Sequence, residues 1–155
     1  MDSLIVSACL LGRPCRYDGA SKGSGAVARF AERWEGRVVA VCPEELGGLP
    51  THRPAAELTG GDGHGVLEGR ARVRRRVDGA DCTAAFVGGA EAARAAAPDA
   101  RRAILKARSP SCGCGRTWID GRLVEGDGVF AALLRRHGIP IVTDEQLAAG
   151  AEEDP

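Results

Sequence analysis

The fold is decided by a short apolar stretch near the start of the sequence, LIVSA at residues 4–8. Isoleucine and valine lie at its centre, and the turn residues Gly12 and Pro14 follow it closely. An apolar run bounded by turn residues is typical of a buried β-strand. The sequence predicts three more strands of this kind, at residues 37–41, 102–106 and 139–142.

Segments with helical periodicity separate these predicted strands. Helices are expected at residues 26–34, 81–97 and 127–137. Ser24 can cap the first helix, and Gly138 follows the third at a position typical of a helix end. Because strands and helices alternate, the sequence predicts an α/β protein. We expect a single open, mostly parallel, Rossmann-like sheet with helices on both faces and long loops at the carboxyl ends of the strands.

The remaining segments are predicted to be loops and exposed hairpins. Residues 46–65 are rich in glycine, which indicates a long surface or site-forming loop. Residues 66–77 alternate weakly and are rich in arginine, so they predict an exposed hairpin or strand. Residues 118–124 predict a hairpin around the turn Asp120-Gly121.

Length and charge exclude several classes of protein. The 155 residues suit one domain, expected over residues 1–147 and followed by a flexible tail at 148–155. The 21 basic residues balance the 21 acidic ones, so no net field is present to hold nucleic acid or an anionic membrane. No apolar run approaches the roughly 18 residues of a membrane span. Since no basic signal segment precedes residue 4, we expect a soluble, cytoplasmic protein without strong nucleic-acid binding.

Six cysteines stand out in this composition. In a reducing cytoplasm, metal ligation or thiol chemistry is a stronger expectation than disulfides. Cys9 follows the first predicted strand, Cys42 follows the second, and Cys112 lies in the loop after the third. Ligands of α/β proteins bind where the carboxyl ends of the strands meet, so we expect these three thiols at one edge of the sheet. An equally open alternative is that Cys9 and Cys42 are small core residues at strand ends.

The spacing of the cysteines bears on the kind of metal. The chain has no close C-x-x-C pair, which disfavours structural zinc, whereas sulfur ligands without histidine favour an iron-sulfur cluster or copper. Three ligands to a 4Fe-4S cluster would leave one iron open as a Lewis acid. The three histidines, His52, His64 and His137, are too scattered for a metalloprotease motif, although the first two lie in the long loop and could face the site.

Four ordered strings carry a more specific signal. They are SACLLG at residues 7–12 with CRYDG at 15–19, CPE at 42–44 with GGLP at 47–50, KARSPSCG at 106–113, and GDGV at 126–129. On these strings, from about residue 4 to residue 142, the chain resembles a bacterial family that was long catalogued as a domain of unknown function. That family includes the 2-thiouracil desulfurase.

The resemblance implies an enzyme that removes sulfur from a small thiolated base without net redox, giving the oxo base and sulfide. It implies a 4Fe-4S cluster bound by Cys9, Cys42 and Cys112. It also makes Glu44 the candidate general base or proton shuttle, and Ser109 a polar group that orients substrate or water. The residues agree, because a carboxylate two positions from a ligand is near enough to accept a proton from water.

Some residues have no clear place in this reading. Cys15 fits the family string but could ligate, hold a transient sulfur or only pack. Cys82 and Cys114 lie outside the motifs. Cys82 is expected to be structural, whereas Cys114 could contact a cluster, although two ligands so close in sequence are geometrically awkward for one cluster. His52 stands where the family commonly has proline. Two other functions stay open: a metal or sulfide carrier or sensor that binds a cluster without turnover, and processing of thiolated RNA nucleosides at an arginine patch over residues 72–76. The expected partner is a thiobase or thionucleoside, and the sequence predicts no oligomeric state.

Overall fold

A parallel four-stranded sheet, sheet A, contributes to both buried cores of the molecule. The computed structural model describes residues 2–150. Sheet A has the strand order β2-β1-β5-β8, and all three neighbouring pairs are parallel. Its strands are β1 (Ser3–Ser7), β2 (Arg37–Val41), β5 (Ala100–Leu105) and β8 (Ile141–Thr143). The four predicted strands and the predicted α/β class are therefore confirmed.

Helices cover both faces of sheet A, as predicted. The three expected helices are α1 (Gly25–Arg33), α4 (Thr83–Ala95) and α5 (Val129–Arg136). Ser24 caps α1, since its side chain accepts a hydrogen bond from the backbone N–H of Val27. Side chains alternate across β1: Leu4 packs in a buried cluster with Phe30 of α1, whereas Ile5 packs in a second cluster with Phe86 of α4.

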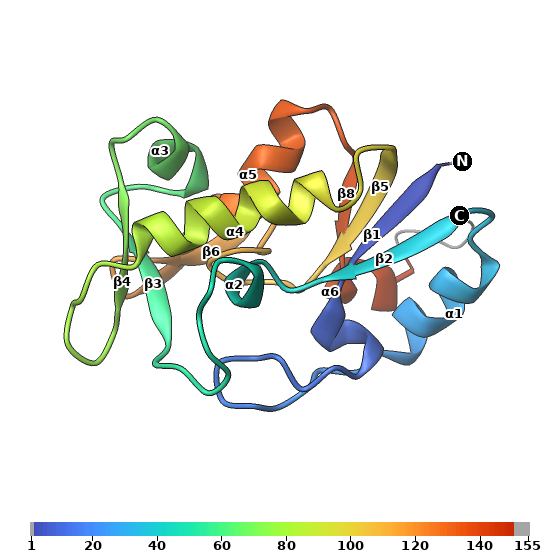
Figure 1. Ribbon diagram of the computed structural model, residues 1–155, viewed down its shortest axis with the longest axis horizontal. Helices are drawn as coiled ribbons and strands as arrows, with labels where there is room; N and C mark the ends of the chain where they lie inside the picture. Colours follow the sequence, from blue (N-terminus) through green and yellow to red (C-terminus); the bar gives the residue numbers. More distant parts are fainter. Residues whose placement is uncertain (1, 151–155) are drawn as a thin grey trace.

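A second sheet, sheet B, lies beside sheet A and was not predicted as a sheet. Its order is β4-β3-β6-β7, and Figure 1 shows β3 and β4 on the side of the molecule away from β1 and β2. The strands are β3 (Ala56–Thr59), β4 (Arg72–Arg75), β6 (Arg116–Ile119) and β7 (Arg122–Glu125). The pairs β3–β4 and β6–β7 are antiparallel, and β3–β6 is parallel.

Sheet B corrects one expectation about the middle of the chain and decides between the two alternatives of another. The stretch at residues 46–65 is not one long loop, because β3 lies within it. For residues 66–77 the strand alternative is confirmed: they contain the end of α3 (Gly63–Leu67) and then β4, which pairs with β3. Four-residue strands between glycine-rich turns give too short a pattern to recognise. The hairpin around Asp120-Gly121 is confirmed, with left-handed φ angles of 50° and 80° at its turn.

Three short helical segments complete the fold: η1 (Ala8–Leu11), α2 (Pro43–Leu46) and α6 (Asp144–Ala148). The first two begin directly after β1 and β2, so they hold Cys9 and the residues after Cys42 at the carboxyl edge of sheet A. The predicted tail starts at the last residue of α6, and residues 151–155 lie outside the described residues. Within residues 2–150, no helix is long and apolar enough to span a membrane.

Candidate active site

A cavity of about 350 Å³ opens at the carboxyl edge of sheet A. Strand β2 lies on one side of β1 and β5 lies on the other side. The loops that follow β1 and β2 therefore diverge from the loop that follows β5 at the carboxyl end of β1. In open α/β sheets this is where ligands bind. Cys9, Cys42 and Cys112 all line the cavity, together with Cys15. The structure thus brings together the three thiols that the strand pattern predicted at this edge.

Each of the three cysteines is held by a different local structure. Cys9 lies in η1, which ends at Gly12 with a left-handed φ of 95°. Cys42 occupies the N-cap position of α2, and Pro43 begins that helix. Cys112 lies in the turn after β5 and is buried. Three segments remote in sequence therefore present sulfur to one cavity.

Cys15 forms hydrogen bonds with Cys9 and Cys42; Cys42 is half-buried, and the other three cysteines of the cavity are buried. Cys42 donates from its Sγ to the carbonyl of Cys15 at 3.7 Å. A hydrogen bond with Cys42 lowers the pKa of Cys15, but a hydrogen bond with Cys9 and burial outweigh it and raise the pKa to about 11. The hydrogen bond with Cys15 and then burial raise the pKa of Cys42. Burial raises the pKa of Cys112 to about 12. A cation that binds these sulfurs must therefore replace their protons.

The donor set is suited to a soft metal centre. The described residues that line the cavity include four cysteines and no histidine. Thiolate donors without imidazole are the ligands of iron-sulfur clusters. The residues present thus fit a cluster held by three of these sulfurs.

Glu44 lines the same cavity, and both of its carboxylate oxygens are held. Its Oε1 accepts a hydrogen bond from Arg53 Nε at 2.9 Å, and its Oε2 accepts one from Ser111 Oγ at 3.2 Å. The side chain of Glu44 is 15% exposed and that of Arg53 is 5% exposed. A charged pair this buried needs its charges compensated by close partners, which these contacts provide.

Arg53 ties the cavity wall together and was missed by sequence reasoning. Its other N–H groups donate to the carbonyls of Cys15 at 3.0 Å and Pro50 at 3.2 Å, and to Thr51 Oγ1 at 3.1 Å. It lies in the segment expected to be a long loop, where one arginine among many gives no sign of burial. The CPE string at residues 42–44, which resembles the family, is the only sequence signal that could have prompted a search for a partner of Glu44.

Ser109 shapes the turn that carries Cys112. Its Oγ accepts hydrogen bonds from the backbone N–H groups of Ser111 at 3.1 Å and Cys112 at 3.0 Å. Ser109 also lines the cavity, so its expected role toward substrate or water stays a prediction. The hydroxyl that contacts Glu44 belongs to Ser111, which the sequence did not single out.

The mouth of the cavity carries aromatic rings with cations above them. Tyr17 is 41% exposed and Trp118 is 37% exposed. The Arg16 guanidinium lies 5.9 Å from the Tyr17 ring centroid, and that of Arg76 lies 5.6 Å from the Trp118 ring centroid. Exposed rings of this kind offer flat surfaces to a heteroaromatic base.

The other cysteines and histidines lie away from the cavity lining. Cys82 is the N-cap residue of α4, and Cys114 is half-buried beside Arg135. Neither residue lines the cavity, nor do His52 and His64.

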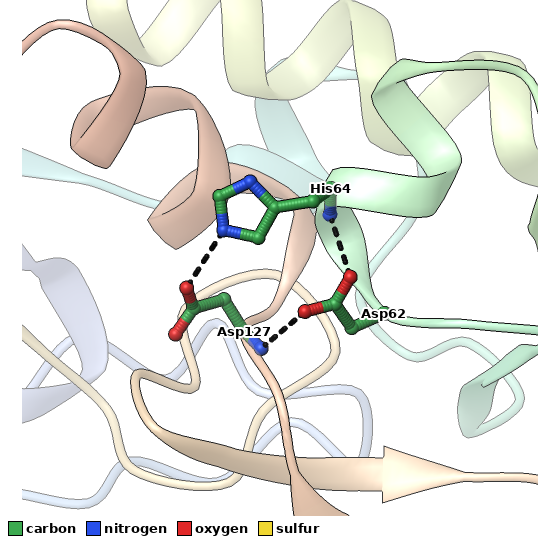
Figure 2. A group of neighbouring side chains, drawn as sticks. All are labelled: Asp62, His64 and Asp127. Atoms are coloured by element: carbon green, nitrogen blue, oxygen red, sulfur yellow. Dashed lines mark hydrogen bonds and ion pairs between the residues drawn. The ribbon is translucent and has the colours of Figure 1, made fainter.

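His64 instead belongs to a polar cluster with Asp62 and Asp127 (Figure 2). Nε2 of His64 lies 2.9 Å from Asp127 Oδ2, and one ligand atom of each residue lies within 4.8 Å of the others. All four carboxylate oxygens already have hydrogen-bond partners. Asp62 accepts from backbone N–H groups at both oxygens, and Asp127 accepts from Gly115 and Arg135 as well as pairing with His64. The cluster is therefore a hydrogen-bond network.

Comparisons with known proteins identify the family of this chain. The family model described as 2-thiouracil desulfurase matches residues 4–146. The uncharacterized protein YbbK of Bacillus subtilis (strain 168) is 38% identical over 149 residues, covering 93% of this chain and 97% of that protein. A solved structure of the 4Fe-4S-dependent thiouracil desulfidase TudS is 44% identical, with a TM-score of 0.77, and covers 97% of this chain and 96% of that chain. This chain belongs to the 2-thiouracil desulfurase family.

Proposed function

We propose that this protein is a desulfurase that converts the thiocarbonyl of 2-thiouracil, or of a similar small thiolated base, to a carbonyl. Water supplies the oxygen and the sulfur leaves as sulfide, so the atoms balance without net oxidation or reduction. The observation that carries the proposal is the placement of Cys9, Cys42 and Cys112 around one cavity with the buried carboxylate of Glu44. The family match and the name of the solved relative TudS support it.

The cofactor of the proposed reaction is a 4Fe-4S cluster, with Cys9, Cys42 and Cys112 as its protein ligands. A cluster held by three thiolates supplies an iron without a protein ligand, which acts as a Lewis acid toward the sulfur of a thiocarbonyl. Cys15 forms hydrogen bonds with both Cys9 and Cys42, and we assign it no role as a ligand.

Glu44 is proposed to accept a proton from the attacking water. It sits on the cavity wall, and the contacts with Arg53 and Ser111 fix the direction of both carboxylate oxygens. A base held in one orientation needs little reorganisation as the proton moves, and general base catalysis requires in addition that the water lies within hydrogen-bond reach of it. Arg53 is a positioning residue here, because each of its nitrogens donates to a protein acceptor.

The cavity suits a small flat substrate. Its volume of about 350 Å³ lies at the lower end of the range for small-molecule sites, and the rings of Tyr17 and Trp118 flank its mouth. A thiobase fits this size class. The absence of strong nucleic-acid binding and the cytoplasmic location stay predictions from the sequence.

Replacement of Glu44 separates an enzyme from a carrier or sensor. In the cluster-loaded protein, Glu44→Gln should abolish sulfide release from 2-thiouracil while the cluster absorbance stays unchanged. Glu68→Gln is the control, because Glu68 pairs with Arg136 on the surface and does not line the cavity. Sulfide release by Glu44→Gln at the wild-type rate would contradict the role of Glu44 and favour a different base.

A further inference from the structure

The turn that carries Cys112 is joined to the start of α5 by backbone hydrogen bonds. No side chain caps α5, and its first N–H groups donate instead to the turn. Gly128 donates to the carbonyl of Gly113 at 2.7 Å, and Phe130 donates to the carbonyl of Ser111 at 2.8 Å. A Cβ at Gly128 would lie 2.5 Å from the Ser111 carbonyl oxygen, so this approach requires glycine. The turn and the helix start therefore form one unit.

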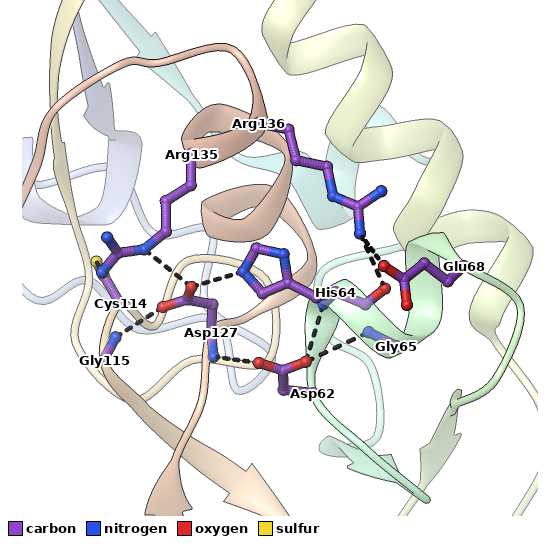
Figure 3. Close-up of polar contacts among 9 residues, drawn as sticks. All are labelled: Asp62, His64, Gly65, Glu68, Cys114, Gly115, Asp127, Arg135 and Arg136. Carbon is purple, nitrogen blue, oxygen red and sulfur yellow. Dashed lines mark hydrogen bonds and ion pairs between the residues drawn. The ribbon is translucent and has the colours of Figure 1, made fainter.

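Asp127 directly precedes Gly128, the N-cap residue of α5, and its side chain holds the end of the turn that lies beyond Cys112 (Figure 3). Its Oδ1 accepts a hydrogen bond from the backbone N–H of Gly115 at 2.8 Å. Its Oδ2 accepts one from Arg135 Nε at 2.9 Å and lies 2.9 Å from His64 Nε2. The side chain of Asp127 is only 10% exposed, so its charge depends on these partners.

Arg135 makes a second contact with the same turn. Its Nη2 donates to Cys114 Sγ at 3.0 Å, two residues beyond Cys112. Asp62, which caps α3 through the N–H of His64, also accepts from the backbone N–H of Asp127 at 3.2 Å. Figure 3 shows these side chains meeting from α3, α5 and the loop before α5. None of Asp62, His64, Asp127 and Arg135 lines the cavity, so they reach the site only through the turn.

We infer that Asp127 is a positioning residue that fixes the Cys112 turn and thereby slows loss of the cluster. The inference rests on the proposed function, because it needs Cys112 as a ligand. Residues 110–115 contain no strand or helix, so their backbone groups depend on partners from elsewhere. Removal of the carboxylate leaves the N–H of Gly115 without its acceptor and frees the turn beyond Cys112 to move. Partners behind a metal ligand typically change metal affinity about 10- to 100-fold.

The test is the rate at which the loaded protein loses its cluster. Wild type and Asp127→Ala are loaded anaerobically and mixed with an iron chelator, and the cluster absorbance is followed at a temperature where both apo proteins remain folded. Asp127→Ala is expected to lose the cluster about 10-fold faster. Glu68→Gln is the matched control: Glu68 pairs with Arg136 of α5 on the surface, and its variant should release at the wild-type rate.

A second pair of variants applies if Asp127→Ala does not fold. Arg135 is 49% exposed, so Arg135→Met should fold; it is expected to release the cluster several-fold faster, with Arg135→Lys restoring much of the difference. Wild-type release rates in the variants that fold would overturn the inference and leave the proposed function intact. Failure of the wild-type protein to take up a cluster would overturn both.

Discussion

Arg53 donates its Nε–H to Glu44 Oε1 across 2.9 Å, in a pair whose side chains are 5% and 15% exposed. The same guanidinium donates to the carbonyl of Cys15, so one side chain joins the loop after η1 to the carboxylate of α2. The chemistry proposed for Glu44 depends on this buried pair.

Shortening this arginine should lower turnover more than substrate binding. Arg53→Lys keeps the charge but has one nitrogen in place of three, so Glu44 loses its fixed orientation. We expect kcat to fall by at least about 10-fold with a much smaller change in KM. Arg13→Lys is the control, because Arg13 makes an exposed pair with the neighbouring Glu45. An equal effect of the two substitutions on kcat would contradict a positioning role for Arg53.

The three proposed ligands should be individually required for the cluster. Serine at position 9, 42 or 112 replaces a soft sulfur with oxygen, so each of Cys9→Ser, Cys42→Ser and Cys112→Ser should lower iron and sulfide content after reconstitution. Cys82→Ser is the control, since Cys82 lies at the N-cap position of α4, donates from its Sγ to the carbonyl of Val73 and does not line the cavity. Iron content and cluster absorbance are the measurements. A variant at position 42 with wild-type cluster content would contradict the ligand set.

The two serines of the Cys112 turn should give different defects. Ser109→Ala removes the acceptor of two backbone N–H groups, so it should lower the free energy of unfolding by about 1–3 kcal/mol. Ser111→Ala removes the hydroxyl that donates a hydrogen bond to Glu44, so it should lower kcat with less effect on stability. Denaturant unfolding and steady-state kinetics separate the two effects. A loss of kcat confined to Ser109→Ala would assign the predicted substrate-orienting role to Ser109 instead.

Adjacent glycines in α4 should respond in opposite ways to alanine. A Cβ at Gly89 would lie 1.9 Å from the carbonyl oxygen of Pro43, so Gly89→Ala must push α2 away and displace Glu44. We expect a loss of about 1–3 kcal/mol of stability together with lower activity. A Cβ at Gly88 would meet no atom within 4 Å, and Gly88→Ala should stabilise by about 0.5–1 kcal/mol through helix propensity. Thermal unfolding of both variants decides; a stabilising Gly89→Ala would contradict the close packing of α2 on α4.

Much of the fold can be predicted from the sequence because its core strands have simple patterns. Residues 3–7 are buried throughout in β1, and such a strand is recognisable as a continuous apolar run. The position of Cys9, Cys42 and Cys112 at one edge follows from the predicted strands and their parallel arrangement. Of sheet B, the β6–β7 hairpin and a strand within residues 66–77 could be predicted, but the sheet as a whole could not, because β3 and β4 have four residues each and are stabilised by pairing with each other.

The partners of the site residues were less accessible to sequence reasoning. Ser111 and Arg53 meet Glu44 from segments 67 and 9 positions away, and no local pattern reports such contacts. The sequence predicts a loop around His64 and so makes this histidine a candidate for the site. It instead pairs with Asp127, 63 positions away, and neither residue lines the cavity.

The central claim is that this chain removes sulfur from a thiolated base at a cluster held by its cysteines. The most direct measurement is sulfide and uracil formation from 2-thiouracil by protein reconstituted anaerobically with iron and sulfide, with the apo protein in parallel. Only the reconstituted protein should turn over, giving one sulfide per uracil. A protein that takes up zinc but no cluster, or that holds a cluster and releases no sulfide from 2-thiouracil, would contradict the claim.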